Sequence, residues 1–130
     1  MGEKKDGNTW YTFQDVVQPA TLRKALMTTF VLDMQWLRAN LGQDTKLVVV
    51  ESYNPTKEPQ GIFQSEGGRV TVVHPEFAKQ RYPIMHSKVM LLFYDSYVRF
   101  VASSANLIEI DWTILGNIVF IQDVPFDAGK

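Results

Sequence analysis

The stretch MHSKVMLLFYDSYVRFVASSANLIEIDW, residues 85–112, decides the fold because it contains a complete β-hairpin. Residues 87–94 and 97–103 are both rich in the branched and aromatic side chains that favour strands, and only Asp95-Ser96 separates them. A two-residue turn predicts that Tyr94 faces Tyr97. Because Asp95-Ser96 lacks the glycine that such turns favour, a longer loop with a different register is the alternative.

The open end of this hairpin gathers three polar side chains. His86 and Lys88 are two residues apart, so they point to the same side of a strand. In the predicted register Lys88 lies opposite Ser103, and His86 lies opposite Ala105, next to Asn106. The geometry of a hairpin alone therefore predicts that an imidazole, an ammonium group and a carboxamide lie close together.

These three groups fit the chemistry of a phosphodiester. A cation and an amide donor hold the non-bridging oxygens on which negative charge develops, and an imidazole attacks phosphorus or protonates a leaving oxygen. One histidine does not fill both roles in the same step, so a catalytic chain would supply half of a site. The competing interpretation is a solvated lysine, an asparagine in a turn and a chance His-x-Lys. His74, which ends a strand before Pro75, is interpreted as structural.

Composition excludes several other classes of protein. The 130 residues suffice for one globular domain, with 45% hydrophobic and 21% charged residues. The sequence has no cysteine, which excludes disulfides and thiolate sites, and its two histidines do not suggest a zinc or iron centre, so we expect no metal or other cofactor. No apolar run approaches the ~20 residues of a membrane span, so we expect no membrane contact.

Charge is distributed unevenly although the net charge is only −1. Residues 69–88 carry four basic side chains against one acidic side chain, whereas the chain after Asn106 is acidic. The four are Arg69, Lys79, Arg81 and Lys88. A basic stretch converging on the hairpin end would suit a phosphate ligand, and ordinary solvated surface is the alternative.

The remaining chain reads as an α/β layered domain. Residues 1–9 are interpreted as a flexible N-terminal end and residues 10–130 as the domain. Apolar residues from Leu22 to Leu41 predict one long helix, or two short helices broken near residues 30–33. The other segments are assigned as follows: residues 46–52 a strand buried on both faces, residues 54–68 an exposed loop, and residues 69–73 and 117–122 two further strands. Together they predict a mixed β-sheet flanked by helices.

The hairpin resembles the phospholipase D superfamily, and more closely its tyrosyl-DNA phosphodiesterase branch. The superfamily pattern has an Asp five positions after the lysine of His-x-Lys and then Gly-Ser-x-Asn. Phe93 occupies the Asp position here, a departure that this branch shares, and residues 103–106 look like a degenerate Gly-Ser-x-Asn. The flanking MLLFY and NLIEIDW are similar as well. The resemblance is strong over residues 82–112, fainter over 20–80 and 117–125, and absent at the N-terminus.

This resemblance implies a fold, a reaction and roles for residues. The fold would be a phospholipase D-like half domain, an α-β-α sandwich from a pseudo-dimer. The activity would be a phosphodiesterase of DNA repair in the nucleus, hydrolysing 3′-phosphotyrosyl adducts through a phosphohistidine without a metal. His86 would be the nucleophile, while Lys88 and Asn106 would hold phosphate oxygens. Ser104 of the degenerate motif would contact substrate. Tyr82, four positions before His86, would stack on a DNA base, with a core or rim aromatic as the alternative.

One departure from the branch is large. Its second His-x-Lys-Asn set, which provides the general acid, is missing from this sequence. The chain would then be the N-terminal half of a longer protein, or two copies would assemble around one site, and by itself it would be inactive. Two competing functions stay open: a non-catalytic module that binds a phosphorylated DNA end or a protein, and a homodimeric phospholipase D-like nuclease or phospholipase.

Overall fold

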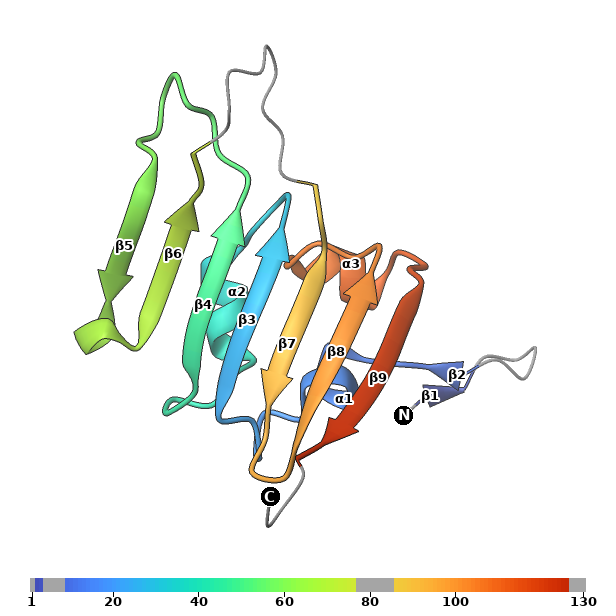
Figure 1. Cartoon of the computed structure of the whole chain (residues 1–130). Coiled ribbons are helices and arrows are strands. Elements are labelled where there is room, and N and C mark those ends of the chain that lie inside the picture. Colours follow the sequence, from blue (N-terminus) through green and yellow to red (C-terminus); the bar gives the residue numbers. More distant parts are fainter. Residues whose placement is uncertain (1, 4–8, 77–85, 127–130) are drawn as a thin grey trace.

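The computed structural model describes residues 2–3, 9–76 and 86–126, and within these ranges one large mixed sheet dominates (Figure 1). Its seven strands are hydrogen-bonded in the order β5-β6-β4-β3-β7-β8-β9. Their bounds are β3 (Lys24–Thr29), β4 (Lys46–Glu51), β5 (Gly61–Ser65), β6 (Val70–His74), β7 (Val89–Phe93), β8 (Tyr97–Ser103) and β9 (Val119–Pro125). A separate two-stranded antiparallel pair joins β1 (Gly2–Glu3) to β2 (Thr9–Trp10).

The directions of the strands bring the open end of the β7–β8 hairpin to the same end of the sheet as the carboxyl ends of the parallel strands. Strands β3, β4 and β6 are parallel, whereas β7, β8 and β9 each run antiparallel to the neighbour before them in the sheet. The carboxyl ends of β3, β4 and β6 therefore lie beside the start of β7 and the end of β8 (Figure 1). We call this end of the strands the upper edge of the sheet. The predicted α/β class with a mixed sheet is confirmed.

The hairpin has the predicted register. Val89 pairs with Ala102, and Phe93 pairs with Val98. The Tyr94 N–H donates to the Tyr97 carbonyl at 3.0 Å, which closes the two-residue turn. The alternative of a longer loop is therefore wrong.

Three short helices meet on one face of the sheet in the described part of the chain (Figure 1). They are α1 (Phe13–Val17), α2 (Met34–Ala39) and α3 (Glu109–Thr113). A capping box between Thr12 and Asp15 starts α1, because each side chain accepts the other residue's backbone N–H. The Phe13 ring packs on Trp36 of α2 at 4.9 Å and on Trp112 of α3 at 5.3 Å, measured between ring centroids.

The core lies between these helices and the sheet. Alternate strand residues facing the helices are fully buried, among them Ala25, Met27, Val49, Leu92 and Val101. Their neighbours, which point to the other face, are only half-buried; examples are Leu26, Val48, Leu91 and Phe100. The strand predicted for residues 46–52 is confirmed as β4, although its two faces differ in burial.

The helix predicted before residue 30 is wrong. Strand β3 occupies this segment and is central in the sheet, and only the second piece of the pattern, α2, is helical. Leu22, Leu26 and Phe30 recur every four residues, a spacing that places side chains on one side of a strand as well as on one side of a helix. Pairing with β4 on one side and β7 on the other decides the outcome.

Two smaller boundaries also differ from expectation. Residues 61–65 are predicted within an exposed loop but form the edge strand β5. Four of the five residues of β5 are exposed, so the segment lacks the alternation of buried and exposed residues that marks a strand. The strands predicted for residues 69–73 and 117–122 are confirmed as β6 and β9, each shifted along the chain. No helix in the described part of the chain is long and apolar enough to cross a membrane.

Candidate active site

His86 and Lys88 lie at the upper edge, immediately before β7. The Nζ atom of Lys88 is 2.9 Å from Nδ1 of His86 and 3.0 Å from the His86 carbonyl oxygen. His86 is exposed and Lys88 is half-buried. The predicted proximity of the imidazole and the ammonium group is therefore present in the structure.

This contact defines the state of the imidazole. An ammonium group only donates hydrogen bonds, so Nδ1 of His86 must accept, and the proton of a neutral ring lies on Nε2. The neutral imidazole has one lone pair, and in this arrangement Lys88 occupies it. An oxyanion that draws the ammonium group away would release that lone pair.

Asn106 follows β8 and presents its amide in one orientation. Its Oδ1 accepts the backbone N–H groups of Phe30 at 3.3 Å and Val31 at 3.1 Å. Two backbone donors identify this atom as the oxygen, so the NH₂ group is the end left to donate. The backbone of Asn106 is fixed too: Asp111 accepts its N–H at 2.7 Å, and the Trp112 indole donates to its carbonyl at 2.9 Å.

Two adjacent threonines at the end of β3 hold both sides of the candidate site. The hydroxyl of Thr28 donates to the Ser87 carbonyl at 2.9 Å and accepts the Val89 N–H at 3.0 Å. The fully buried hydroxyl of Thr29 donates to the Val31 carbonyl at 2.7 Å and accepts the Leu107 N–H at 3.1 Å. Sequence reasoning missed both threonines, because it assigned them to a helix.

Phe30 contacts both sides of the candidate site. Besides the N–H that it donates to Asn106, its ring stacks on the imidazole of His86, with centroids 4.8 Å apart and planes inclined by 26°. No hydrogen bond joins Asn106 directly to His86 or Lys88 among the described residues. Sequence reasoning placed Phe30 on an apolar helix stripe, but the residue is 38% exposed.

The two residues proposed to contact substrate are placed differently. The Ser104 hydroxyl donates to Oδ1 of Asn117 and accepts the Ile118 N–H, both at 2.9 Å. It thus fastens the end of β8 to the segment before β9. Tyr82 lies outside the described residues.

His74 is structural in its contacts, as interpreted. Its ring nitrogens lie 2.7 Å from a Glu51 carboxylate oxygen and 2.8 Å from the Pro59 carbonyl, and the ring stacks on Tyr53 at 4.6 Å. Burial opposes the charge, but the hydrogen bonds to Glu51 and Pro59 together outweigh it and raise the pKa of His74.

Of the basic stretch expected to converge on the site, the structure describes only Arg69 and Lys88. Arg69 lies before β6, at the opposite edge of the sheet, and pairs with Glu66 at 3.1 Å. Lys79 and Arg81 lie outside the described residues. Lys88 is thus the member of this stretch that the structure places at the upper edge.

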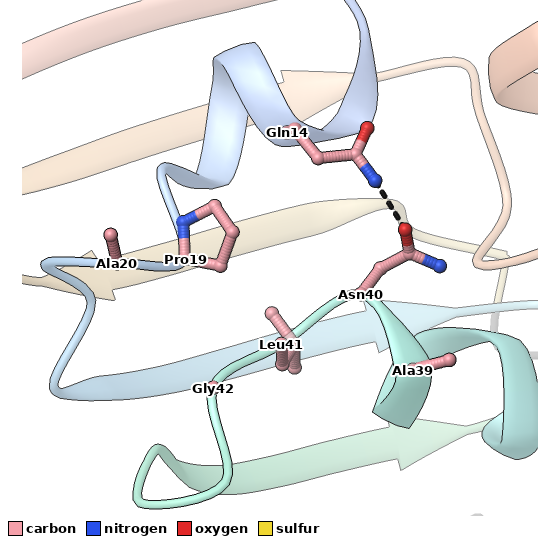
Figure 2. A pocket seen from close by; sticks show the side chains of 7 residues that line it. All are labelled: Gln14, Pro19, Ala20, Ala39, Asn40, Leu41 and Gly42. Carbon is pink, nitrogen blue, oxygen red and sulfur yellow. Dashed lines mark hydrogen bonds between the residues drawn. The ribbon is translucent and has the colours of Figure 1, made fainter.

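Two hollows of the described surface lie away from the candidate site. One, of about 290 Å³, is lined by residues from α1, α2 and the segments after them, and a hydrogen bond from Gln14 to Asn40 crosses it (Figure 2). A second, of about 550 Å³, lies between α1 and Arg99. Neither contains a residue of the candidate site. Within the described ranges, no group of three or more His, Cys, Asp or Glu side chains is arranged to hold a metal ion.

Comparison with known proteins gives the same family that the hairpin sequence resembles. The family model for tyrosyl-DNA phosphodiesterase matches residues 2–127. Tyrosyl-DNA phosphodiesterase 1 of Arabidopsis thaliana is 28% identical over 109 residues, which are 78% of this chain and 17% of that relative. The crystal structure of the yeast tyrosyl-DNA phosphodiesterase is similar in fold, with a TM-score of 0.61 at 13% identity, covering 83% of this chain and 27% of that one. A mutant of the yeast enzyme superposes with a TM-score of 0.62 at 12% identity. The chain thus spans about a quarter or less of the length of these relatives.

Proposed function

The chain belongs to the tyrosyl-DNA phosphodiesterase family, and we propose that it supplies half of a phosphodiesterase site for 3′-phosphotyrosyl DNA ends. The observation that carries this proposal is the contact between Lys88 and His86, 2.9 Å from Nζ to Nδ1. Phe30 links this pair to Asn106, whose NH₂ end is left to donate, because its ring stacks on His86 and its N–H donates to Oδ1 of Asn106. A cation, an amide donor and a nitrogen nucleophile are three of the groups that a phosphoryl transfer without metal uses, and a general acid for the leaving oxygen is the fourth.

The proposed reaction has two steps. Lys88 and Asn106 bind non-bridging oxygens of the phosphodiester, which removes the ammonium group from the imidazole. The lone pair of a His86 ring nitrogen then forms a bond to phosphorus while the bond from phosphorus to the tyrosine oxygen breaks. The leaving phenolate takes a proton from an acid. Water next attacks the phosphohistidine, which releases a 3′-phosphate and restores the imidazole.

The acid is the group that must come from elsewhere. His74 is held by Glu51 and Pro59, so it is not a free donor at the upper edge. A second half domain of a longer protein, or a second copy of this chain, would contribute the acid. The first source is supported by the length of the relatives, of which this chain covers 17% and 27%.

Covalent trapping tests this proposal. The chain is mixed with an oligonucleotide carrying a 3′-phosphotyrosine, alone and with added partner half domain, and products are identified by mass spectrometry. We expect an adduct on a histidine that is lost in His86→Ala and retained in His74→Ala. Absence of cleavage and adduct under every condition would contradict the proposal.

The competing function is a non-catalytic module that binds a phosphorylated DNA end. It uses the same two donors but needs no lone pair on His86. It predicts binding of a 3′-phosphate oligonucleotide that is lost in Lys88→Ala and unaffected in His86→Ala. Cleavage in the trapping experiment excludes it.

A further inference from the structure

We propose that Phe30 is a positioning residue that orients the imidazole of His86 for attack, an inference that rests on the proposed function. Nothing in the sequence motif includes this residue. Its role follows from two contacts, one made by the aromatic ring of Phe30 and one made by its backbone N–H.

The first contact is the ring stack. The Phe30 and His86 rings are 4.8 Å apart at an inclination of 26°, within the range of favourable offset stacking. His86 is exposed and precedes β7, so the backbone hydrogen bonds of that strand do not hold its backbone. A flat apolar surface on one face of the imidazole removes most of the ring orientations otherwise open to an exposed side chain.

Stacking also uses neither ring nitrogen of the imidazole. A hydrogen-bonding partner would occupy one of the two ring nitrogens, and Lys88 already occupies Nδ1. The Phe30 ring instead contacts the π face, so it fixes the plane of the imidazole without competing for a lone pair. This is the requirement for a nucleophile that must approach phosphorus along one line.

The second contact fixes the backbone of Phe30. Its N–H donates to Oδ1 of Asn106 at 3.3 Å, and the preceding residue, Thr29, is fully buried. The backbone that carries the aromatic ring is therefore tied to the same asparagine that donates to the phosphate. A shift of the Phe30 backbone would move the nucleophile and the amide donor together, which keeps their separation constant.

Nuclear magnetic resonance on the chain itself tests the stack without any need for activity. We expect nuclear Overhauser contacts between the Phe30 ring protons and the imidazole protons of His86. In Phe30→Leu we expect the side-chain couplings of His86 to average over several rotamers, whereas Phe30→Tyr keeps a single rotamer. Phe63→Leu is the matched control, because Phe63 is similarly exposed, at 42%, but packs against His74.

Single-turnover adduct formation tests the consequence for the reaction. In Phe30→Leu we expect the rate at saturating oligonucleotide to fall about tenfold, while the half-saturating concentration changes less than about twofold. Phe30→Tyr should restore most of the rate. Circular dichroism confirms that each variant is folded.

Three results would overturn the positioning role: no Overhauser contact between the rings, a single His86 rotamer in Phe30→Leu, or a loss that appears only in the half-saturating concentration. Failure of the proposed function is distinguishable, since it abolishes adducts in the unsubstituted chain but leaves the resonance measurements intact. In that case the rotamer data alone decide whether Phe30 orients His86.

Discussion

The ammonium nitrogen of Lys88 lies 2.9 Å from Nδ1 of His86, so the cation and the imidazole of the candidate site are joined before any substrate binds. In the proposed reaction each group also has a task at a phosphate: the cation holds an oxygen and the imidazole attacks phosphorus. The lone pair of Nδ1 becomes available to phosphorus only when the ammonium group turns away from it. The proposed order of events therefore begins with the transfer of Lys88 from histidine to phosphate.

Replacement of Lys88 tests this contact. Wherever the His86 ring of the free chain is neutral, we expect the nitrogen resonances of the tautomer that carries its proton on Nε2. Lys88→Met should redistribute the proton between the two ring nitrogens and weaken binding of a 3′-phosphate oligonucleotide by about tenfold or more, because charged hydrogen bonds contribute about 1.5–3 kcal/mol. Lys24→Met, at the opposite edge of the sheet, is the matched control; equal losses in both variants would contradict a specific role for Lys88.

Two substitutions of Asn106 separate its structural role from its binding role. Asn106→Asp keeps the acceptor for the N–H groups of Phe30 and Val31, so the free energy of unfolding should change by less than about 0.5 kcal/mol. It removes the NH₂ donor and adds a negative charge, so phosphate binding should be lost. Asn106→Ala leaves those N–H groups without this acceptor and should cost about 1–2 kcal/mol.

Urea denaturation and titration with 3′-phosphate oligonucleotide check both variants of Asn106. Asn54→Asp is the control for added charge, since Asn54 likewise uses Oδ1 to accept a backbone N–H, from Thr56, in the loop that follows β4. Retained binding in Asn106→Asp would show that the NH₂ group is not a phosphate donor.

Thr29 should be important for stability rather than for chemistry. Thr29→Val removes a fully buried hydroxyl that donates to the Val31 carbonyl and accepts the Leu107 N–H. Each backbone group loses one partner but keeps the other, since the Leu107 N–H also donates to the Val31 carbonyl at 3.2 Å, so we expect a loss of about 1 kcal/mol in urea denaturation. Thr71→Val on β6 repeats the same change at a half-buried position and should cost less. A neutral Thr29→Val would show that the hydrogen bond between the two backbone groups is sufficient without the hydroxyl.

His74 should make stability depend on pH. Both of its ring nitrogens face acceptors, Glu51 and Pro59, which suits the doubly protonated ring and raises the pKa of His74 in the folded chain. Its contribution is complete below the unfolded pKa of about 6.5 and is lost as pH rises through the folded pKa.

Urea denaturation across this range should show the free energy of unfolding decreasing as pH rises, with a slope of at most about 1.4 kcal/mol per pH unit for one proton. His74→Gln should remove that dependence. An increase in stability over the same range in the unsubstituted chain would contradict the assigned charge state.

The hairpin could be predicted from sequence because its determinants are local. Two apolar runs separated by Asp95-Ser96 permit few registers, and the observed pairing of Val89 with Ala102 is the simplest of them. Once that register is given, the positions of His86 and Lys88 follow from the alternation of a strand.

The support for the site could not be predicted because it depends on a distant segment. Strand β3 ends with Thr28 and Thr29, and Phe30 follows it; the hydrogen bonds of these three residues reach residues 59 to 78 positions further along the chain. Leu22, Leu26 and Phe30, in and around this strand, fit a helix equally well by spacing. The parallel pairing of β3 with β4 is a tertiary feature that no local pattern specifies.

The most direct test of the site is a titration of the labelled chain with inorganic phosphate, followed at three side chains: the His86 ring nitrogens, Lys88 Nζ and Asn106 Nδ2. A shared anion site predicts that all three resonances shift along one saturation curve with one dissociation constant, and that His74 does not respond. Separate constants, or a response of Lys88 without Asn106, would contradict a single phosphate site formed by these residues.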